Sequence, residues 1–268
     1  MIWKWTAFMI DSVCLIARHE DEELIMDAKE RMILALDVGA FHEAQELVER
    51  FREHVGMFKV GKQLFTASGP KIVDFLKSRG AKVFLDLKYH DIPNTVSKAA
   101  VEAARLGVDM FNVHASGGFT MMAHTREAIR EEAEIHGTRQ PKIIAVTLLT
   151  SIDSAELARM GIALSPRELV GRLALLTKEA GLDGVVASGQ ELELIRELCG
   201  KEFIIVTPGV RVTETRDDQK RTSGPAEAIL KGATYLVLGR TVLAATNPPE
   251  MLAQVEKQIS DALSGQQK

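Results

Sequence analysis

The stretch KVFLDLK at residues 82–88, followed by an amphipathic segment at 94–107, decides the fold. Apolar residues dominate the first part up to Asp86, which is typical of a strand buried on both faces, as in a parallel sheet covered by helices. The second part has the length and the periodicity of a surface helix. Together the two parts predict one strand and helix unit.

The same alternation runs along the chain from residue 32, where seven further apolar runs are each followed by a helical stretch. Eight such units predict an α/β protein with a closed (β/α)8 TIM barrel in a single domain. The expected strands are 32–38, 57–61, 82–88, 110–115, 142–149, 184–189, 203–210 and 235–240. The expected helices are 41–54, 70–79, 94–107, 120–136, 165–180, 190–199, 225–232 and 248–263.

An open, doubly wound sheet is the main alternative, and the turn after the first strand argues against it. Such a sheet usually has fewer strands and a glycine-rich dinucleotide turn after the first one. Here that turn reads LDVGAFHEA (36–44) and contains no GxGxxG, and no GxxxxGK[ST] occurs in the sequence. Neither dinucleotide binding nor a P-loop is therefore indicated.

Composition and charge narrow the class of protein further. The chain has 268 residues, of which 46% are hydrophobic, so it can bury a large core and is too apolar for disorder. With 33 basic and 37 acidic residues the net charge is −4, which indicates no broad nucleic-acid or membrane surface. Cys14 and Cys199 form no CxxC pattern, so neither a disulfide framework nor a structural zinc site is expected. The cytoplasm is the expected compartment.

The first thirty residues differ from the rest. Lys4 and Asp11 interrupt their apolar part, which is shorter than the roughly 20 residues that cross a bilayer. Asp11 and the lack of a clean small-residue cleavage site also argue against a signal peptide. We expect residues 1–30 to be a dispensable, poorly ordered leader, with Met26 or Met32 as an alternative start, and residues 31–268 to form the barrel. A short amphipathic helix docked on the barrel is the alternative.

Charged residues gather where the predicted strands end. Asp86 and Lys88 are two positions apart, so on an extended strand both side chains leave by the same face. Lys59 closes the preceding strand, and Asp37 closes the one before it. Chemistry in such barrels lies at the carboxyl ends of the strands, and neighbouring strands are about 4.8 Å apart. The sequence therefore predicts an alternating line of acid and base in which each ion stabilises its neighbours.

The residues alone leave two interpretations of this line open, a structural ion-pair network and a catalytic site. In either case opposite-sign neighbours keep both lysines protonated, whereas Schiff-base chemistry needs a neutral lysine. His114, at the end of the fourth strand, could similarly serve as an acid or base, or as a structural hydrogen-bonding residue.

The segment RVTETRDDQKRTS (211–223) is long for a connection in a compact domain. Long connections are often binding loops or lids, although a solvated surface loop is the ordinary alternative. Its position after the seventh strand favours a binding loop, because phosphate sites in these barrels are commonly built after strands seven and eight.

One segment carries a resemblance to a known family: DLKYHDIPNT (86–95) is similar to the signature of orotidine 5′-phosphate decarboxylase, in its bacterial form. The match extends from residue 32 to about 260. Thr241 departs from it, because proline usually follows Gly-Arg in the bacterial form, and this affects local backbone stiffness only. Further matching segments are LALD (34–37), FKVGKQLF (58–65), NVHASGG (112–118), VTLLTS (146–151), TPGVR (207–211), DDQKR (217–221) and LGR (238–240).

The resemblance implies decarboxylation of orotidine 5′-monophosphate to uridine 5′-monophosphate, the last step of de novo pyrimidine synthesis, with neither metal nor cofactor. It implies that Lys88 faces the developing carbanion and then protonates it, while Asp86 lies beside the departing carboxylate. Lys59 and Asp37 would fix the array and contact the ribose hydroxyls.

The resemblance also implies a homodimer with shared active sites, in which the loop after the third strand completes the neighbouring subunit's site. The catalytic residue in that loop would be Asp91. The substrate-contacting residues implied there are Ile92, Pro93 and Thr95. Elsewhere, those implied are Thr150 at the pyrimidine edge, Pro208, Arg211 and Gln219 in the closing loop, and Arg240 with the Gly239 backbone at the phosphate.

Two other functions stay open. A magnesium-dependent sugar-phosphate decarboxylase or synthase of the same barrel superfamily also carries DxKxxD, but it has an acid for Mg²⁺ where Lys59 stands, and it lacks DIPNT. A non-catalytic barrel that binds nucleotides or regulates a partner is the alternative from another class. Every charged position of the signature is intact here, which argues against this second alternative.

Overall fold

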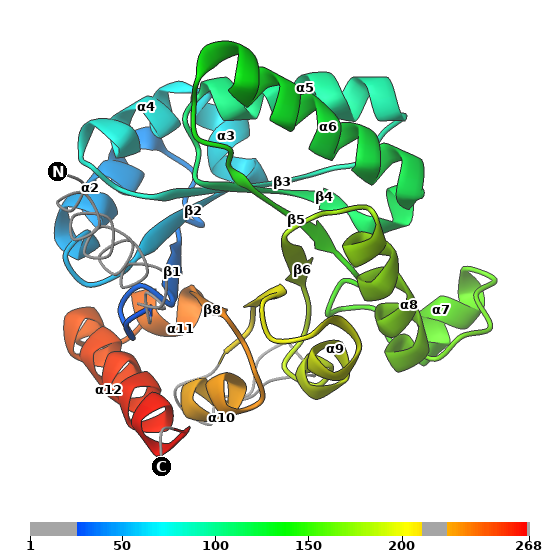
Figure 1. Ribbon diagram of the computed structural model, residues 1–268. Coiled ribbons are helices and arrows are strands. Elements are labelled where there is room, and N and C mark those ends of the chain that lie inside the picture. The colour runs from blue at the N-terminus through cyan, green and yellow to red at the C-terminus, as the bar shows by residue number, and fades with distance from the viewer. Residues whose placement is uncertain (1–25, 211–223, 267–268) are drawn as a thin grey trace, which may run out of the picture.

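The computed structural model describes residues 26–210 and 224–266. Its eight parallel strands form a closed barrel in sequence order, because β1 pairs with both β2 and β8. Figure 1 shows the strands around one axis with the helices outside them. This confirms the predicted (β/α)8 barrel. The strands are β1 Met32–Ala35, β2 Met57–Gly61, β3 Val83–Tyr89, β4 Met110–His114, β5 Lys142–Val146, β6 Gly184–Val186, β7 Ile204–Thr207 and β8 Tyr235–Leu238.

Each predicted helix is present within a few residues of its expected ends. Four of the eight helices begin at a proline. Proline lacks a backbone N–H, and it suits this position because an N–H in the first turn has no partner within the helix. The eight predicted helices are observed as α2 Phe41–Phe51, α4 Lys71–Ser78, α5 Pro93–Arg105, α6 Gly118–His136, α8 Pro166–Glu179, α9 Leu192–Cys199, α10 Pro225–Leu230 and α12 Pro248–Gln266.

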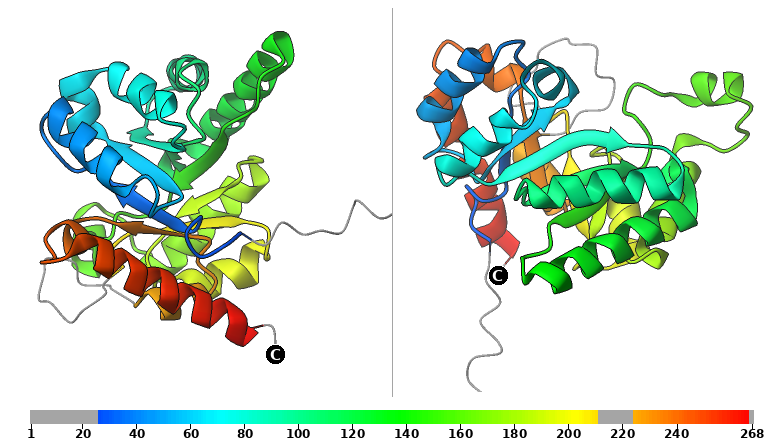
Figure 2. Two further views of the ribbon diagram at one scale, coloured as in Figure 1. Left: turned by 90° about the vertical axis from the view of Figure 1, so that its left-hand side faces the viewer. Right: turned by 90° about the horizontal axis from the view of Figure 1, so that it is seen from above.

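Three short helices and one 3₁₀ turn were not predicted, and all follow strand ends. The 3₁₀ turn is η1 Ala115–Gly117, and the helices are α3 Lys62–Ser68, α7 Ser154–Arg159 and α11 Arg240–Leu243. Both side views in Figure 2 show helices covering the barrel, and in its right-hand view α7 projects from the body. No helix in the described ranges combines the length and apolar character needed to span a bilayer.

The barrel is packed on both sides of its sheet. Inward-facing residues from all eight strands meet in one apolar cluster, among them Ile33, Met57, Phe84, Met110, Ile144 and Val206. Their outward-facing neighbours, such as Leu34 and Leu85, belong to a larger cluster between sheet and helices. This two-sided burial explains why the strands read as continuous apolar runs. The interior below the site is filled, so polar chemistry is confined to the mouth.

One strand departs from regular geometry beside the predicted site. Along the β3–β4 pair the register runs from Leu85 opposite Phe111 to Tyr89 opposite Val113, so four steps on β3 face two on β4. Lys88 has φ 53°, the one positive φ among the described non-glycine residues. The end of β3 is therefore not the regular extended strand on which the prediction for Asp86 and Lys88 was based. The two side chains nevertheless meet.

The expected leader falls mostly outside the described residues. Of the part that is described, Ala28 is buried in the outer cluster, and Glu30 forms an ion pair with Lys82 across 3.2 Å.

Candidate active site

Four charged side chains lie in contact at the carboxyl ends of the first three strands. The Lys59 ammonium lies 3.1 Å from Oδ1 of Asp37 and 3.2 Å from Oδ2 of Asp86. The Lys88 ammonium lies 2.5 Å from Oδ1 of Asp86. The predicted alternating line is therefore present in the order Asp37, Lys59, Asp86, Lys88, which we call the ion array.

The centre of the ion array is withdrawn from solvent. The side chains of Asp86 and Lys59 are 10% and 11% exposed, whereas that of Asp37 is 51% exposed. Burial pushes the pKa of Asp86 up, but the charges of Lys59 and Lys88 and two hydrogen bonds outweigh it, so this pKa lies below its usual range. Asp86 is therefore a fixed anion at neutral pH, held between two cations.

Two hollows open on either side of Lys59 and Asp86. The first, about 190 Å³, has mainly apolar walls and includes Lys88, and we call it the apolar hollow. The second, about 240 Å³, extends to Asp37 and Arg240, and we call it the polar hollow. Val237 and Pro208 line both. The remaining lining residues of the apolar hollow are Phe84, Val146, Leu148, Leu149, Thr150, Val186, Ala187 and Val206, and those of the polar hollow are Ala35, Gly209, Val210, Gly239 and Thr241.

The hollows assemble most of the predicted site but not all of it. Thr150 lies at the apolar hollow, Gly239 and Arg240 lie at the polar hollow, and Pro208 lies at both. Arg211 and Gln219 lie outside the described residues.

The loop after β3 is the part of the predicted site that stays apart from the ion array. Asp91, Ile92 and Thr95 are exposed around the start of α5, where Pro93 is the first residue. Oδ1 of Asp91 accepts a hydrogen bond from the backbone N–H of Ile92 at 2.6 Å. Within the described part of this chain, Asp91 makes no ion pair with the ion array.

Two residues at the site were not predicted. Asn112 is fully buried on β4, and its side chain hydrogen-bonds to Asp86 and to the backbone of Lys88. Gly61 lies two residues after Lys59, and a Cβ there would stand 3.3 Å from the Lys59 ammonium. Such a contact is tight, so glycine leaves room for that ammonium. A polar residue in the middle of an apolar strand was the available signal for Asn112.

His114, at the end of β4, lies beside the ion array. Its ring centroid is 5.3 Å from that of His90. Burial, then the nearby His90, Lys62 and Lys88, lower the pKa of His114 to about 4. His114 is therefore neutral at pH 7, which leaves it without a proton to donate as a cationic acid.

The low pKa of His114 predicts that acid destabilises the fold. Between about pH 6.5, the ordinary histidine pKa, and about pH 4 the unfolded chain binds a proton that the folded chain excludes, so stability falls as the pH falls. We expect His114→Gln to reduce the loss of unfolding free energy between pH 7 and pH 5 by about 1 to 2 kcal/mol, allowing for solvent screening. Urea denaturation at both pH values measures this. The exposed His42→Gln is the control, and an equal pH dependence in both variants would contradict the assignment.

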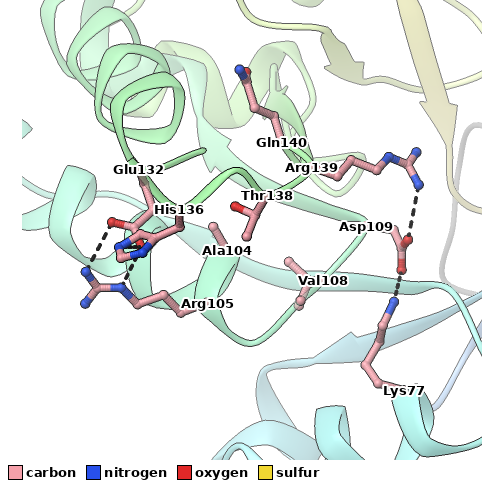
Figure 3. Close-up of a pocket in the computed structure, with 11 residues that line it drawn as sticks. Lys77, Ala104, Arg105, Val108, Asp109, Glu132, His136, Thr138, Arg139 and Gln140 are labelled. Atoms are coloured by element: carbon pink, nitrogen blue, oxygen red, sulfur yellow. Dashed lines mark hydrogen bonds and ion pairs between the residues drawn. The ribbon is translucent and has the colours of Figure 1, made fainter. Parts of the chain in front are cut away.

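A larger hollow, of about 700 Å³, lies at the opposite end of the barrel, around Asp109 just before β4. Figure 3 shows its charged side chains paired with one another. Lys77 contacts Asp109 at 2.9 Å, and Arg105 contacts Glu132 at 2.8 Å. Mutual pairing leaves little uncompensated charge for a ligand, and the amino-terminal end of such barrels usually serves stability.

The residues at the barrel mouth offer a poor metal site. Across residues 26–210 and 224–266, no three or more histidine, cysteine or acidic side chains cluster so as to hold a metal ion. Between the two carboxylates that could have shared one, Asp37 and Asp86, the structure places the ammonium of Lys59. A cation fixed at that point repels a divalent ion.

A closed parallel barrel, with buried fixed charges where its strands end, defines the class: a single-domain (β/α)8-barrel enzyme with its active site at the carboxyl end. The family model described as "Orotidine 5'-phosphate decarboxylase / HUMPS family" matches residues 30–255. The chain belongs to this family, and it is a carboxy-lyase.

Curated relatives and solved structures agree with this membership. The chain is 52% identical to the orotidine 5′-phosphate decarboxylase of Geotalea daltonii over 87% of this chain and 97% of the relative. It is 53% identical to that of Moorella thermoacetica over 85% and 91%. The crystal structure of the Lactobacillus acidophilus enzyme of the same name is 33% identical and has a TM-score of 0.75, covering 85% of this chain and 98% of the other.

Proposed function

We propose that this chain decarboxylates orotidine 5′-monophosphate to uridine 5′-monophosphate and CO₂, the last step of de novo pyrimidine synthesis. The curated relatives that support this proposal are named for that activity, and the chain matches them over almost their whole length. The single observation that carries the chemistry is the ion array, with Lys59, Asp86 and Lys88 in contact at the mouth of the barrel.

The reaction needs fixed charge because of where its electrons go. When the bond between C6 and the carboxylate breaks, CO₂ leaves and the electron pair stays in an in-plane orbital of C6, which the π system of the pyrimidine cannot delocalise. An ammonium about 4 Å from that carbon contributes on the order of 4 kcal/mol at an effective dielectric of 20. Enzymes lower barriers by roughly 8 to 23 kcal/mol, so several preorganised charges are needed.

Lys88 is the group that meets the carbanion in this proposal. Its side chain is 25% exposed and lines the apolar hollow, and its ammonium is paired with Asp86. It transfers a proton to C6, forming the C–H bond that replaces the lost carboxylate, and the neutral amine regains a proton from water. Asp86 holds Lys88 in place and stands beside the departing carboxylate, where repulsion opposes the bound ground state.

The remaining residues bind the rest of the nucleotide. Lys59 and Asp37 face the polar hollow and would contact the ribose hydroxyls. Arg240 lies at the same hollow, where its guanidinium fork suits a phosphate dianion, together with the Gly239 backbone. Thr150 and Pro208 line the apolar hollow, which suits the flat pyrimidine. Arg211 and Gln219 would close over the phosphate and exclude water, so that phosphate binding contributes to transition-state stabilisation.

Two rivals are weaker on the same observations. A magnesium-dependent sugar-phosphate enzyme would need a metal at Asp37 and Asp86, where Lys59 is bound instead. A non-catalytic nucleotide-binding barrel has no need of a buried lysine and aspartate in an ion array, because buried charges are costly unless they are paired and used.

The decisive assay follows the absorbance of orotidine 5′-monophosphate as purified protein consumes it in the presence of EDTA. We expect turnover at an unchanged rate, because no step requires a metal. Activity that EDTA abolishes and Mg²⁺ restores would favour the magnesium-dependent rival. Tight nucleotide binding without turnover would favour the non-catalytic one. Lys88→Ala should lose this activity, and Lys178→Ala, altered on the exposed surface of α8, is its matched control.

We propose that two copies of the chain form a homodimer through the rim after β3, β4 and β5. Ile92, Phe119, Leu149 and Met160 are apolar and 66%, 47%, 40% and 55% exposed there. Asp91 lies beside this apolar rim and is absent from its own ion array, which is the arrangement expected if it completes the partner's site. Exposed apolar side chains gathered at one rim are typical of an interaction surface.

We further propose that the protein works in the cytoplasm without a cofactor, and that residues 1–30 lie outside the catalytic domain. The family match begins at residue 30, which supports this boundary.

A further inference from the structure

Asn112 is a polar residue in a place where an apolar one would ordinarily pack. It lies on β4 between Met110, which belongs to the inner apolar cluster, and His114, and its side chain has no exposed surface. An amide buried there costs free energy unless both its donor and its acceptor are used. The contacts that it makes therefore account for its presence.

Both ends of the Asn112 amide bind the catalytic strand. Its Nδ2 donates to Oδ1 of Asp86 at 2.7 Å, and its Oδ1 accepts from the backbone N–H of Lys88 at 2.8 Å. The partners fix the orientation of the amide, because a carboxylate only accepts and a backbone N–H only donates. Oδ1 of Asp86 is the atom that also binds the Lys88 ammonium. A single side chain thus holds the anion and the backbone of its cation.

The backbone of Lys88 needs this support. Its φ of 53° lies in the left-handed region, which is strained for a residue with a side chain. The register shift between Leu85 and Tyr89 also interrupts the β3–β4 ladder at this point. Asn112 supplies the acceptor that the ladder does not. Such strained residues persist only where their surroundings hold them.

We propose that Asn112 is a positioning residue for decarboxylation: it clamps the irregular end of β3 so that the Lys88 ammonium stays on Asp86 and faces the apolar hollow. This inference rests on the proposed function. It assigns Asn112 no contact with the substrate and no proton transfer. Its contribution is to hold the charges of the ion array in one geometry before the substrate arrives.

Two variants separate the two contacts. Asn112→Asp keeps an acceptor for the Lys88 N–H but sets a second carboxylate against Asp86. Asn112→Ser is too short to keep both contacts. We expect kcat to fall about 100-fold in each, as small misplacements of catalytic groups do, with a smaller change in KM. In Asn112→Asp the acid limb of the pH–rate profile should also move to higher pH, because two facing carboxylates hold a proton more tightly.

The measurements are steady-state kinetics from pH 5 to 9, with every rate divided by the fraction of protein that is folded by circular dichroism. Asn247→Asp, the same substitution at an exposed site on the protein surface, is the matched control. A kcat loss with a shifted acid limb supports the proposal. Variants no slower than the control, or a loss proportional to unfolding with the acid limb unmoved, would overturn it while leaving the wild-type activity intact. An inactive wild type would instead refute the proposed function.

Discussion

Lys88→Ala is expected to lower kcat by about 10⁵-fold. Removing an ammonium near C6 forfeits on the order of 4 kcal/mol of carbanion stabilisation, which is about a thousandfold in rate. Losing the general acid that protonates C6 costs a further factor of about 10² or more. KM should change far less, because the proposed phosphate and ribose contacts are with residues of the polar hollow, which Lys88 does not line.

The fold should survive this substitution. Asp86 keeps its ion pair with Lys59 at 3.2 Å and its hydrogen bond from Asn112 at 2.7 Å, so no buried charge is left unpaired. Thermal melting of Lys88→Ala beside Lys178→Ala checks this point. A Lys88→Ala variant that is folded and turns over within tenfold of wild type would contradict the assigned role.

The second large loss of activity is expected at the proposed shared site. Asp91→Ala alone should lose activity on the order of 10³-fold, because the partner's ion array loses a neighbouring anion. Mixing it with Lys88→Ala should restore up to about a quarter of the wild-type activity, because half of the dimers are hybrids and each hybrid has one undamaged site.

The matched control mixes Lys88→Ala with Asp86→Asn. Both of these residues belong to the ion array of one chain, so every site in a hybrid of these two variants is damaged, and no activity should return. Differently tagged subunits that co-purify demonstrate exchange. Exchange without recovery in the Lys88→Ala and Asp91→Ala mixture would show that each chain has a complete site of its own.

Much of the fold follows from the sequence because periodicity reports burial. All eight strands were predicted, since runs buried on both faces leave a continuous apolar signal. The short helices α3, α7 and α11 were missed, because four to seven residues are too few to display a helical period. The predicted ends of β1, β5, β6 and β7 lie beyond the observed ends, because apolar residues continue into the loops that form the mouth of the barrel.

The ion array was predictable for a different reason, namely that charges at consecutive strand ends must meet. The geometry of Lys88 was not, because a left-handed lysine has no sequence signature comparable to a glycine. Asn112 was missed because a polar residue within an apolar strand indicates only that it has a partner, whereas its role depends on a register shift between two strands. Asp91 lies outside the ion array of its own chain, and its proposed role in a partner's site could not be derived from the pattern of one chain.

The central claim is that fixed ions at the barrel mouth make an anion at C6 of the pyrimidine accessible. Microscopic reversibility provides the most direct test: in D₂O with EDTA, the protein should exchange the C6 proton of uridine 5′-monophosphate for deuterium, as followed by proton NMR. We predict slow exchange at C6, none at C5, and loss of exchange in Lys88→Ala. Normal turnover of orotidine 5′-monophosphate with C6 exchange no faster than in protein-free buffer would contradict the claim.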